Sequence, residues 1–398
     1  RDSSVTGVQT CALPIWRGVV DCAEKGDVRG YKPLAAYRVE HEYRTFSQDS
    51  QINYTFNFYE DGNVLSIVVA AGSHGTHVAG IVAAYYPEDP KRNGQAPGAQ
   101  LVSVKIGDTN LGTMETNPGM IRGLLATVEN KCDMINMSYG EQTSDPNTGR
   151  FVELAQDIVK KHGIIYVSSA GNAGPCLSTV GSPGGNEEYL IGVGAFITPS
   201  MVQPQYSMTS DLQDDGRNYQ WSSRGPRADG SMGVCISALG AACAPVPTWA
   251  LQPTQLMNGT SMSSPAACGG IALLVSALKQ MKAKYTPFRI KAAIEAAAKQ
   301  IPGNDVDHFA LGSGLLNIPN TFAWLEKYLD EKKLDLHYKV SITPAGRQEQ
   351  MRGIYIRENG GTSRVQNYSL SVSAEFPKWQ FEIDAENNAI KAGDVNLD

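Results

Sequence analysis

The feature that most constrains the fold is a run without charge, Ala266 to Leu278, in which small or apolar residues occupy every side of a helix. A helix that is apolar all round is stable only inside a large domain. The segment Asn258–Pro265 leads into this run. Gly259 permits a sharp turn, and Pro265 falls in the first helical turn, where its missing N–H does no harm. The sequence therefore predicts that Ser261 lies at the N-terminus of a buried helix.

Two further segments place one polar side chain among small residues. Ser73–Gly80 carries His74 at the start of a predicted helix, and Ser168–Pro175 carries Asn172 in a glycine-rich turn. Taken singly, Ser261 is an ordinary helix-capping residue and Asn172 a residue that tolerates a left-handed turn. Together they predict a serine hydrolase, with His74 as general base, Asn172 as a donor to the oxyanion and Ser261 as nucleophile.

A metal site at His74 and His77 is the competing interpretation of the first segment. The glutamate of an HExxH motif is absent, and no third ligand lies nearby in the sequence. We therefore expect His77 to point into the core as a structural residue. We expect neither a metal nor another cofactor.

Short apolar strands alternate with helices over most of the chain, which is typical of a parallel sheet covered on both faces. The sequence thus predicts an α/β fold with a doubly wound, mostly parallel sheet. Strands are expected at residues 64–71, 101–106, 132–138, 163–168, 190–196 and 234–238, and helices at residues 74–86, 120–130, 151–160, 288–298 and 321–329.

The pattern changes after the charged stretch Asp330–Leu334. Residues 336–343, 353–357 and 366–376 alternate between apolar and polar side chains, as half-buried antiparallel strands do. They predict that residues 335–398 form the start of a β-sandwich-like domain that ends before it can close. Residues 1–15 show neither helical nor strand periodicity, and we expect them to be a foreign, artefactual segment. The α/β domain is then expected to span residues 16–329.

Composition excludes several classes of partner. A formal charge of −6 and a pI near 5.6 argue against nucleic acid or an anionic membrane surface as a partner. No uncharged apolar run approaches the roughly 20 residues of a membrane span. Seven scattered cysteines without a CxxC pair fit a reducing compartment. Glycosylation sequons at Asn136 and Asn258, beside the predicted chemistry, also favour a cytoplasmic location.

The predicted strand at residues 132–138 ends in Ser138-Tyr139-Gly140. An exposed strand edge at this point could pair with an extended peptide backbone. Ser138 and Gly140 are therefore candidates for binding the backbone of a substrate. The alternative is a strand end with ordinary turn residues.

The segments around His74, Asn172 and Ser261 resemble the subtilisin-like (S8) serine peptidases, which supports a subtilisin-like form of the α/β fold. Within that family the chain is most similar to the branch that releases tripeptides, almost continuously from Trp16 to about Leu329. From Leu336 on, it resembles the start of that branch's large β region. The resemblance also rests on the stretches DGNVLSI (61–67), NGQAPG (93–98), KIGDTNLGTMET (105–116), SYGE (138–141), PCLSTVGSPGG (175–185), WSSRGP (221–226) and residues 255–265.

The resemblance implies an activity and its specificity. Members of this branch remove tripeptides from the free N-termini of oligopeptides in the cytosol and assemble into very large homo-oligomers. Two glutamates that hold the α-ammonium group of the substrate match Glu115 and Glu141. Paired carboxylates would stop the peptide a fixed number of residues from Ser261. Without the resemblance, both would be surface glutamates, and an endopeptidase or an inactive S8-like module in an assembly would be the alternatives.

The chain departs from the family at the acid of the triad. That aspartate should end an apolar strand and precede Ser-Gly or Thr-Gly, but no such sequence occurs. Asp21 follows Gly18-Val19-Val20, yet Cys22-Ala23 comes next, and the matching family stretch lies between acid and base. We expect a piece that lacks its acid and first strand, so that the full-length protein is active and this chain at most feebly so.

Overall fold

The computed structural model describes residues 16–108, 111, 114–143, 145–209, 215–302, 307–345, 350–356 and 365–375. The chain divides into two compact units. The first comprises residues 1–74, 108–113 and 246–253, and the second comprises residues 75–107, 114–245 and 254–398. The segment 1–15, expected to be foreign, lies outside the described residues. The domain boundaries expected from the sequence stay a prediction.

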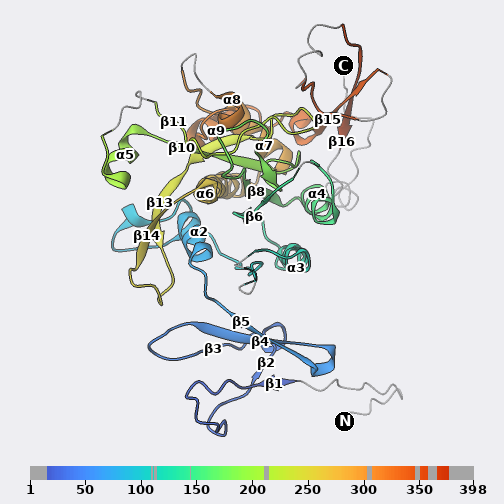
Figure 1. Ribbon diagram of the computed structural model, residues 1–398. Helices are drawn as coiled ribbons and strands as arrows, with labels where there is room; N and C mark the ends of the chain where they lie inside the picture. The colour runs from blue at the N-terminus through green and yellow to red at the C-terminus, as the bar shows by residue number, and fades with distance from the viewer. Residues whose placement is uncertain are drawn as a thin grey trace. The chain divides into compact units, whose positions relative to one another are not determined.

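A mostly parallel sheet forms the centre of the second unit (Figure 1). Strand β8 (Ile165–Ser169) pairs in parallel with β6 (Met134–Met137) and with β10 (Ile191–Ile197). Strand β10 also pairs in parallel with β12 (Ile236–Leu239) and antiparallel with the short β11 (Arg217–Asn218). Every residue of β8 and β10 is buried, which explains why neither strand carries a charged residue or alternates between a polar and an apolar face. The predicted α/β class is confirmed.

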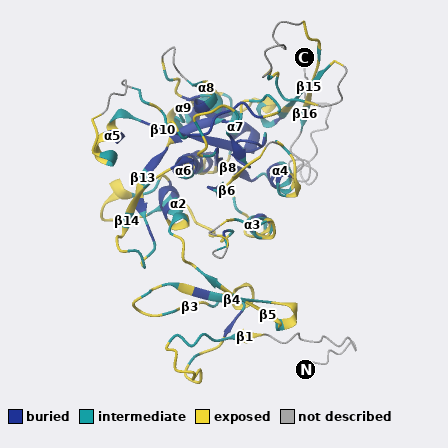
Figure 2. Ribbon diagram, in the orientation of Figure 1, coloured by how far each residue is buried: buried dark blue, intermediate teal, exposed yellow. Residues whose placement is uncertain are grey.

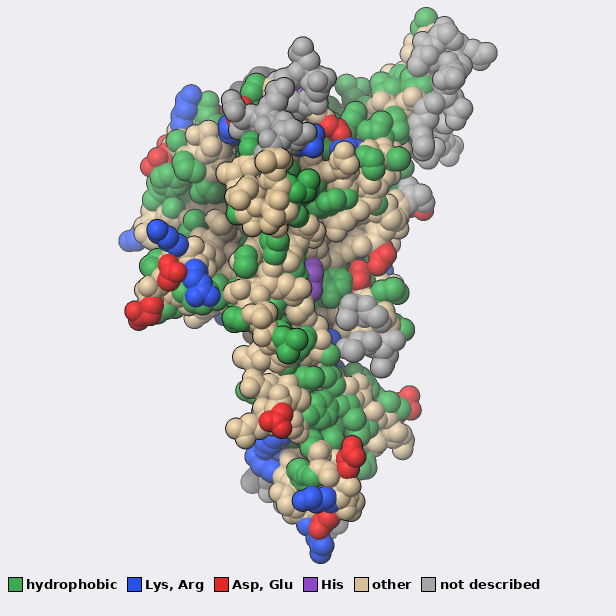
Figure 3. All heavy atoms as spheres, turned by 60° about the vertical axis from the view of Figure 1, so that its left-hand side comes forward, with side chains coloured by type: hydrophobic (Ala, Val, Ile, Leu, Met, Phe, Trp, Pro, Cys, Tyr) green, Lys and Arg blue, Asp and Glu red, His purple; other side chains and the backbone are tan. Residues whose placement is uncertain are grey.

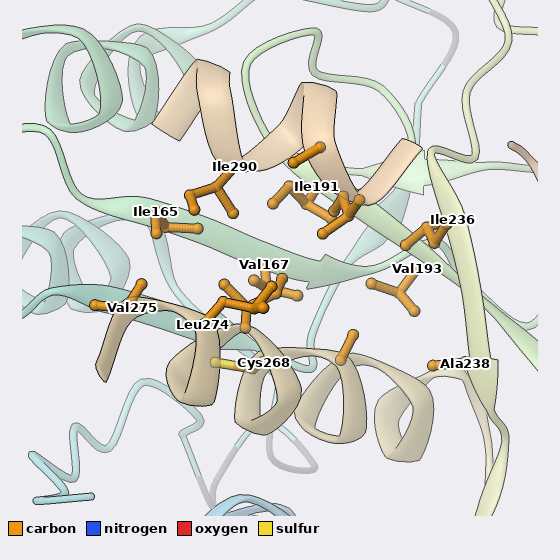
Figure 4. Close-up of a cluster of buried hydrophobic side chains, with 14 of the residues drawn as sticks. Ile165, Val167, Ile191, Val193, Ile236, Ala238, Cys268, Leu274, Val275 and Ile290 are labelled. Atoms are coloured by element: carbon orange, nitrogen blue, oxygen red, sulfur yellow. The ribbon is translucent and has the colours of Figure 1, made fainter. Parts of the chain in front are cut away.

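Helices cover both faces of this sheet. Figure 4 shows the strands between α6 (Thr260–Gln280), which carries Cys268 and Leu274, and α7 (Pro287–Ala296), which carries Ile290. Helix α6 contacts β6, β8, β10 and β12. In the described part of the chain it is the one helix long and apolar enough to cross a membrane, contrary to the expectation that no run approaches that length, and 67% of its apolar stretch is buried inside the protein. Figure 2 shows it in the dark core of the unit, as its sequence predicts.

Helices α3, α7 and α9 begin at capping residues that the sequence supplies. Thr116 caps α3 (Asn117–Glu129), Thr286 caps α7 and Asn317 caps α9 (Ile318–Lys327), each by accepting a backbone N–H through its side-chain oxygen. Helix α4 (Arg150–His162) is amphipathic and ends at Gly163 in the left-handed conformation. The remaining helices are α2 (His74–Ala83), α5 (Pro199–Tyr206), α8 (His308–Leu311) and the short 3-10 turns at Pro90–Arg92 and Lys332–Asp335.

Among the described residues of this unit, three antiparallel ladders lie outside the central sheet. They are β7 (Glu141–Gln142) with β9 (Gly181–Ser182), β13 (Ala241–Pro245) with β14 (Thr254–Asn258), and β15 (His337–Pro344) with β16 (Tyr368–Glu375). The last confirms the strands expected at residues 336–343 and 366–376. The strand expected at 353–357 is wrong for residues 353–356, which are irregular; residue 357 lies outside the described part.

The first unit is built on a small antiparallel sheet of β3 (Arg44–Thr45), β4 (Asn53–Tyr59) and β5 (Val64–Val69). Leu34, Tyr54 and Phe56 form its core. It also contains β1 (Arg17–Gly18), β2 (Leu34–Ala35), α1 (Tyr37–Glu40) and a 3-10 turn at Glu60–Gly62. The assignment of residues 64–71 to the parallel sheet is therefore wrong, because β5 finds its partner in the neighbouring β4 across a short turn.

The strand expected at residues 101–106 is also absent from the structure, which describes all six residues. Their backbone is irregular, and Leu101 and Val102 are exposed. An alternating pattern produces a strand only where a neighbouring strand accepts its hydrogen bonds, and no described strand pairs with this segment.

Candidate active site

Ser261 lies in the first turn of the buried helix α6, as predicted. Strand β14 ends at Asn258, and Gly259 turns the chain into the helix with a φ of +154°, a value that residues with a side chain rarely adopt. The carbonyl oxygen of Gly259 accepts hydrogen bonds from the N–H groups of Met262 and Ser263. The N–H of Ser261 stands one position earlier, where a helix offers no acceptor of its own. This donor is therefore available to a ligand beside the Ser261 hydroxyl.

Asn172 is held directly against the start of α6. Its Oδ1 accepts hydrogen bonds from the backbone N and from the Oγ1 of Thr260, each at 2.9 Å. The Nδ2 of Asn172 has no acceptor among the described residues. A Cβ atom built on Gly259 would lie 3.5 Å from this Nδ2 and 3.6 Å from the N of Ser261. Two N–H donors thus border one spot beside Ser261, an arrangement able to bind an oxyanion.

A second loop supports the turn that carries Asn172. Ser223 is fully buried; its Oγ accepts from the N of Ala173 at 3.0 Å, and its N donates to the carbonyl oxygen of Gly171 at 2.9 Å. Ser223 therefore forms hydrogen bonds with the backbone on both sides of Asn172. Sequence reasoning did not assign Ser223 a role, and its place in the WSSRGP stretch was the only signal.

The end of β6 is joined to the first turn of α6. The Oγ of Ser138 donates to the carbonyl oxygen of Ser261 at 2.9 Å, and the Oγ of Ser261 donates to the carbonyl oxygen of Ser138 at 3.3 Å. Asn136 links the same elements, since its Oδ1 accepts from Ser264 at 2.7 Å and its Nδ2 donates to Ser138 Oγ at 3.1 Å. The side chain and the carbonyl oxygen of Ser138 thus both contact α6, and the binding of a substrate backbone at Ser138 and Gly140 stays a prediction.

Gly140 lies where a side chain could not fit, since an added Cβ would lie 2.6 Å from the carbonyl oxygen of Ser182. The next residue, Glu141, is exposed and stands opposite Ser182 in the β7–β9 ladder. Glu115 forms an isolated bridge with Gly107. Burial, and then the charge of Glu115, raise the pKa of Tyr139. The charge of Glu115 therefore acts on Tyr139, two residues before Glu141 in the chain, and the pairing of Glu115 with Glu141 stays a prediction.

His74 and His77 stand in different environments. His74 is the first residue of α2 and the last residue of the first unit. Its approach to Ser261 stays a prediction. His77 is fully buried, its Nε2 lies 2.8 Å from the carbonyl oxygen of Gln255, and burial lowers its pKa. The expected core position of His77 is confirmed.

Asp21, considered as the acid of a triad, closes a turn in the first unit. Its Oδ1 accepts from the N of Ala23 at 3.2 Å and its Oδ2 from the N of Gly26 at 2.6 Å. Both oxygens are therefore engaged by backbone groups. Across the residues with described positions, no group of three or more His, Cys, Asp or Glu side chains could hold a metal ion. Cys22, Cys132, Cys176, Cys235, Cys243 and Cys268 are free thiols, and Cys11 lies outside the described part.

Comparison with known proteins gives consistent matches. The family model described as the Subtilase family matches residues 30–314. Tripeptidyl-peptidase 2 of Oryza sativa subsp. japonica is 46% identical over 370 residues, which cover 91% of this chain and 27% of that protein. Tripeptidyl-peptidase 2 of Drosophila melanogaster is 37% identical over 388 residues, which cover 94% of this chain and 26% of that protein. The chain thus spans about a quarter of the length of the curated relatives it matches.

A solved structure agrees with these relatives. The crystal structure of Tripeptidyl Peptidase 2 (TPP II) superposes with a TM-score of 0.66 at 36% sequence identity, covering 82% of this chain and 25% of that one.

Proposed function

The chain belongs to the subtilase family and has its subtilisin-like fold, and on this premise we propose that it cleaves peptide bonds with Ser261 as nucleophile and His74 as general base. The observation that carries the proposal is the position of Asn172. The N–H and the hydroxyl of Thr260 both donate to Asn172 Oδ1, and this fixes the orientation of the amide. The Nδ2 of Asn172 therefore faces the same spot as the N–H of Ser261.

In the proposed reaction, the Oγ of Ser261 attacks the carbonyl carbon of the substrate while His74 accepts its proton. The negative charge that develops on the carbonyl oxygen receives hydrogen bonds from Asn172 Nδ2 and the N–H of Ser261. The amine product leaves with the proton from His74, and an ester on Ser261 remains. Water then hydrolyses the ester, again with His74 as base.

We propose peptides with a free N-terminus as substrates and tripeptides as products. The support is the similarity to relatives named tripeptidyl-peptidase 2, together with the exposed Glu141 and the charge of Glu115 acting on Tyr139, two residues before Glu141. Two carboxylates would hold the α-ammonium group by charge-assisted hydrogen bonds and fix the distance to Ser261. A cytoplasmic location and a large homo-oligomer in the full-length protein belong to the same proposal.

No aspartate of this chain is assigned as the acid of the triad. In subtilisin, removing that aspartate alone lowers kcat by about 3 × 10⁴, which corresponds to roughly 6 kcal/mol of barrier. We therefore expect the chain by itself to react slowly with a fluorophosphonate probe, at Ser261. Labelling should vanish in Ser261→Ala and persist in Ser276→Ala, which alters an exposed serine of the same helix. Equal labelling of Ser261→Ala and the unaltered chain would refute the assignment of the nucleophile.

Binding to Ser261→Ala tests the substrate class without turnover. A fluorescent hexapeptide with a free N-terminus should bind at least tenfold more tightly than its acetylated counterpart, since a pair of charged hydrogen bonds contributes about 1.5–3 kcal/mol or more. Glu141→Gln and Glu115→Gln should each reduce the difference, whereas Glu129→Gln, at an exposed position on α3, should leave it unchanged. Equal binding of both peptides would favour an endopeptidase.

A further inference from the structure

Residues Met351–Ile356, which we call the crossing segment, lie between β15 and β16 in the sequence. On one side, Met351 exchanges two backbone hydrogen bonds with Ile342 of β15, at 2.7 and 2.8 Å. On the other side, the N–H groups of Arg352 and Gly353 both donate to the carbonyl oxygen of Asp229, at 2.8 and 3.0 Å. The crossing segment therefore joins the C-terminal hairpin to a loop of the α/β part of the second unit.

A largely buried ion pair of intermediate exposure, between Arg352 and Glu188, strengthens this contact. The Nε of Arg352 lies 2.9 Å from the Oε2 of Glu188, and the two side chains are only 15% and 12% exposed. The same guanidinium donates to the carbonyl oxygen of Val340 at 3.0 Å and to the Oγ of Ser341 at 2.9 Å. Because Glu188 follows the buried residue Glu187 in the α/β part, the ion pair fixes the hairpin and the crossing segment to it together.

The crossing segment also contacts the loop of residues 176–180. A Cβ atom added to Gly353 would overlap the carbonyl oxygen of Gly230, so the two backbones are in close contact. Two residues further on, the hydroxyl of Tyr355 receives a hydrogen bond from the Oγ of Ser178 at 3.3 Å. Ser178 has a φ of +59°, in the left-handed region that a non-glycine residue adopts at a cost. The contact with Tyr355 thus helps to hold a loop in which Ser178 has an unfavourable backbone conformation.

The loop of residues 176–180 and the strand that follows it, β9, contact the segment that carries Glu141. The carbonyl oxygen of Thr179 accepts from the Nε2 of Gln142 at 3.1 Å. Immediately after the loop, β9 pairs with β7, with Ser182 opposite Glu141 and Gly181 opposite Gln142. Two residues in register are a minimal ladder, which cannot persist in water without support from its surroundings. The position of Glu141 therefore depends on how firmly this loop is held.

We propose that the crossing segment is a specificity-determining element: Gly353 keeps it packed against Gly230, and Tyr355 holds the loop of residues 176–180 through Ser178, so that the β7–β9 ladder positions Glu141 to bind the ammonium group of a peptide. The identity of the ligand rests on the proposed function, whereas the contacts that connect the crossing segment to the β7–β9 ladder do not depend on it. Gly353 and Tyr355 are positioning residues, because they act through Ser178 and Gly230 rather than on the substrate.

Hydrogen exchange and peptide binding together test this inference, in the Ser261→Ala background. In Tyr355→Phe, amides of residues 176–182 and 141–142 should exchange about two- to tenfold faster, as expected for the loss of one hydrogen bond of about 0.5–1.5 kcal/mol. Gly353→Ala should have an effect in the same direction, because the added methyl group forces the crossing segment away from Gly230. Exchange in β8 should stay unchanged. The preference for the free N-terminus over the acetylated peptide should fall by a similar factor.

Tyr338→Phe is the matched control, because Tyr338 is a tyrosine of the same hairpin that is 45% exposed; it should change neither quantity. Unaltered exchange at residues 176–182 in both variants would overturn the inference, and so would faster exchange with an unchanged preference. Equal binding of both peptides by the chain without a crossing-segment substitution would instead refute the proposed function and the ligand named here, whatever the exchange shows.

Discussion

Gly259 is the residue on which the geometry of the candidate oxyanion site depends most directly. Its φ of +154° is costly for any residue with a side chain, by about 1–3 kcal/mol. In Gly259→Ala, the new methyl group would also occupy the spot bordered by Asn172 Nδ2 and the Ser261 N–H. We expect the fluorophosphonate reaction to slow by on the order of 10²-fold. An unchanged rate of labelling, measured below the melting temperature of the variant, would show that no oxyanion binds there.

Glu187 gives a residue-scale prediction about pH. It is 3% exposed, one oxygen has no partner among the described residues, and burial, followed by the charge of Glu188, raises its pKa to about 7 from an ordinary 4.5. The folded state therefore holds a proton that the unfolded state has released between these values. The resulting stability is fully present below pH 4.5 and is lost as the pH rises through 7.

Glu187→Gln should remove this dependence, because the neutral amide keeps the shape and can still accept the hydrogen bond from Gln156. At pH 8 the free energy of unfolding of the variant should exceed that of the unaltered chain by about 1–3 kcal/mol, and the difference should shrink toward pH 5. Denaturant titrations at both pH values measure it, with the exposed Glu153→Gln as control. A difference that is constant with pH would mean that Glu187 is ionised throughout.

At the scale of elements, the hydrogen bonds of Asn136 and Ser138 with α6, here called the seam between β6 and α6, link the stability of the sheet to the candidate site. In Asn136→Ala, Ser264 loses its acceptor and Ser138 loses a donor in a partly buried place. We expect a loss of about 1–3 kcal/mol in the free energy of unfolding and slower labelling of Ser261. Asn320→Ala, on the exposed side of α9, should do neither. Destabilisation without any change in labelling would show that the seam serves the fold alone.

Elements whose signal is local were predictable from the sequence. Helices α4, α7 and α9 carry an apolar face and terminal residues of the expected kinds, and α6 was evident from its uniform apolar character. Pairing was not predictable, because it depends on residues far away in the sequence. Residues 64–69 and 101–106 have similar apolar patterns, yet the first segment found a partner in β4 and the second has none among the described strands.

The candidate site shows the same difference between local signals, which the sequence reveals, and contacts between distant residues, which it does not. His74, Asn172 and Ser261 stand in motifs that identify them individually. The commitment of Ser138 to α6, the support of Asn172 by Ser223 and the contact of Tyr355 with Ser178 join residues that are many positions apart. Such contacts leave no pattern in a single sequence, since each side chain alone is an ordinary polar residue.

At the scale of the whole molecule, the two units have separate hydrophobic cores. Leu34, Tyr54 and Phe56 form the core of the first, and the residues around Leu274 of α6 form one of several buried clusters in the second. On the face drawn in Figure 3, acidic and basic side chains lie in small mixed groups, so charge does not single out either unit. Stability should therefore be set by two sets of apolar contacts that respond separately to substitution.

We expect Phe56→Ala to destabilise the first unit by about 3–5 kcal/mol and Leu274→Ala to destabilise the second by about 2–5 kcal/mol, since both side chains are at most 1% exposed and truncation leaves a cavity. Hydrogen exchange should show lost protection in β4 and β5 for the first variant and in β8 and α6 for the second. Val64→Ala, at a position 43% exposed, is the control for the first unit. If Phe56→Ala lowered protection equally in β8 and α6, the two cores would be one cooperative structure. Labelling of Ser261 would then depend on the first unit as strongly as on α6.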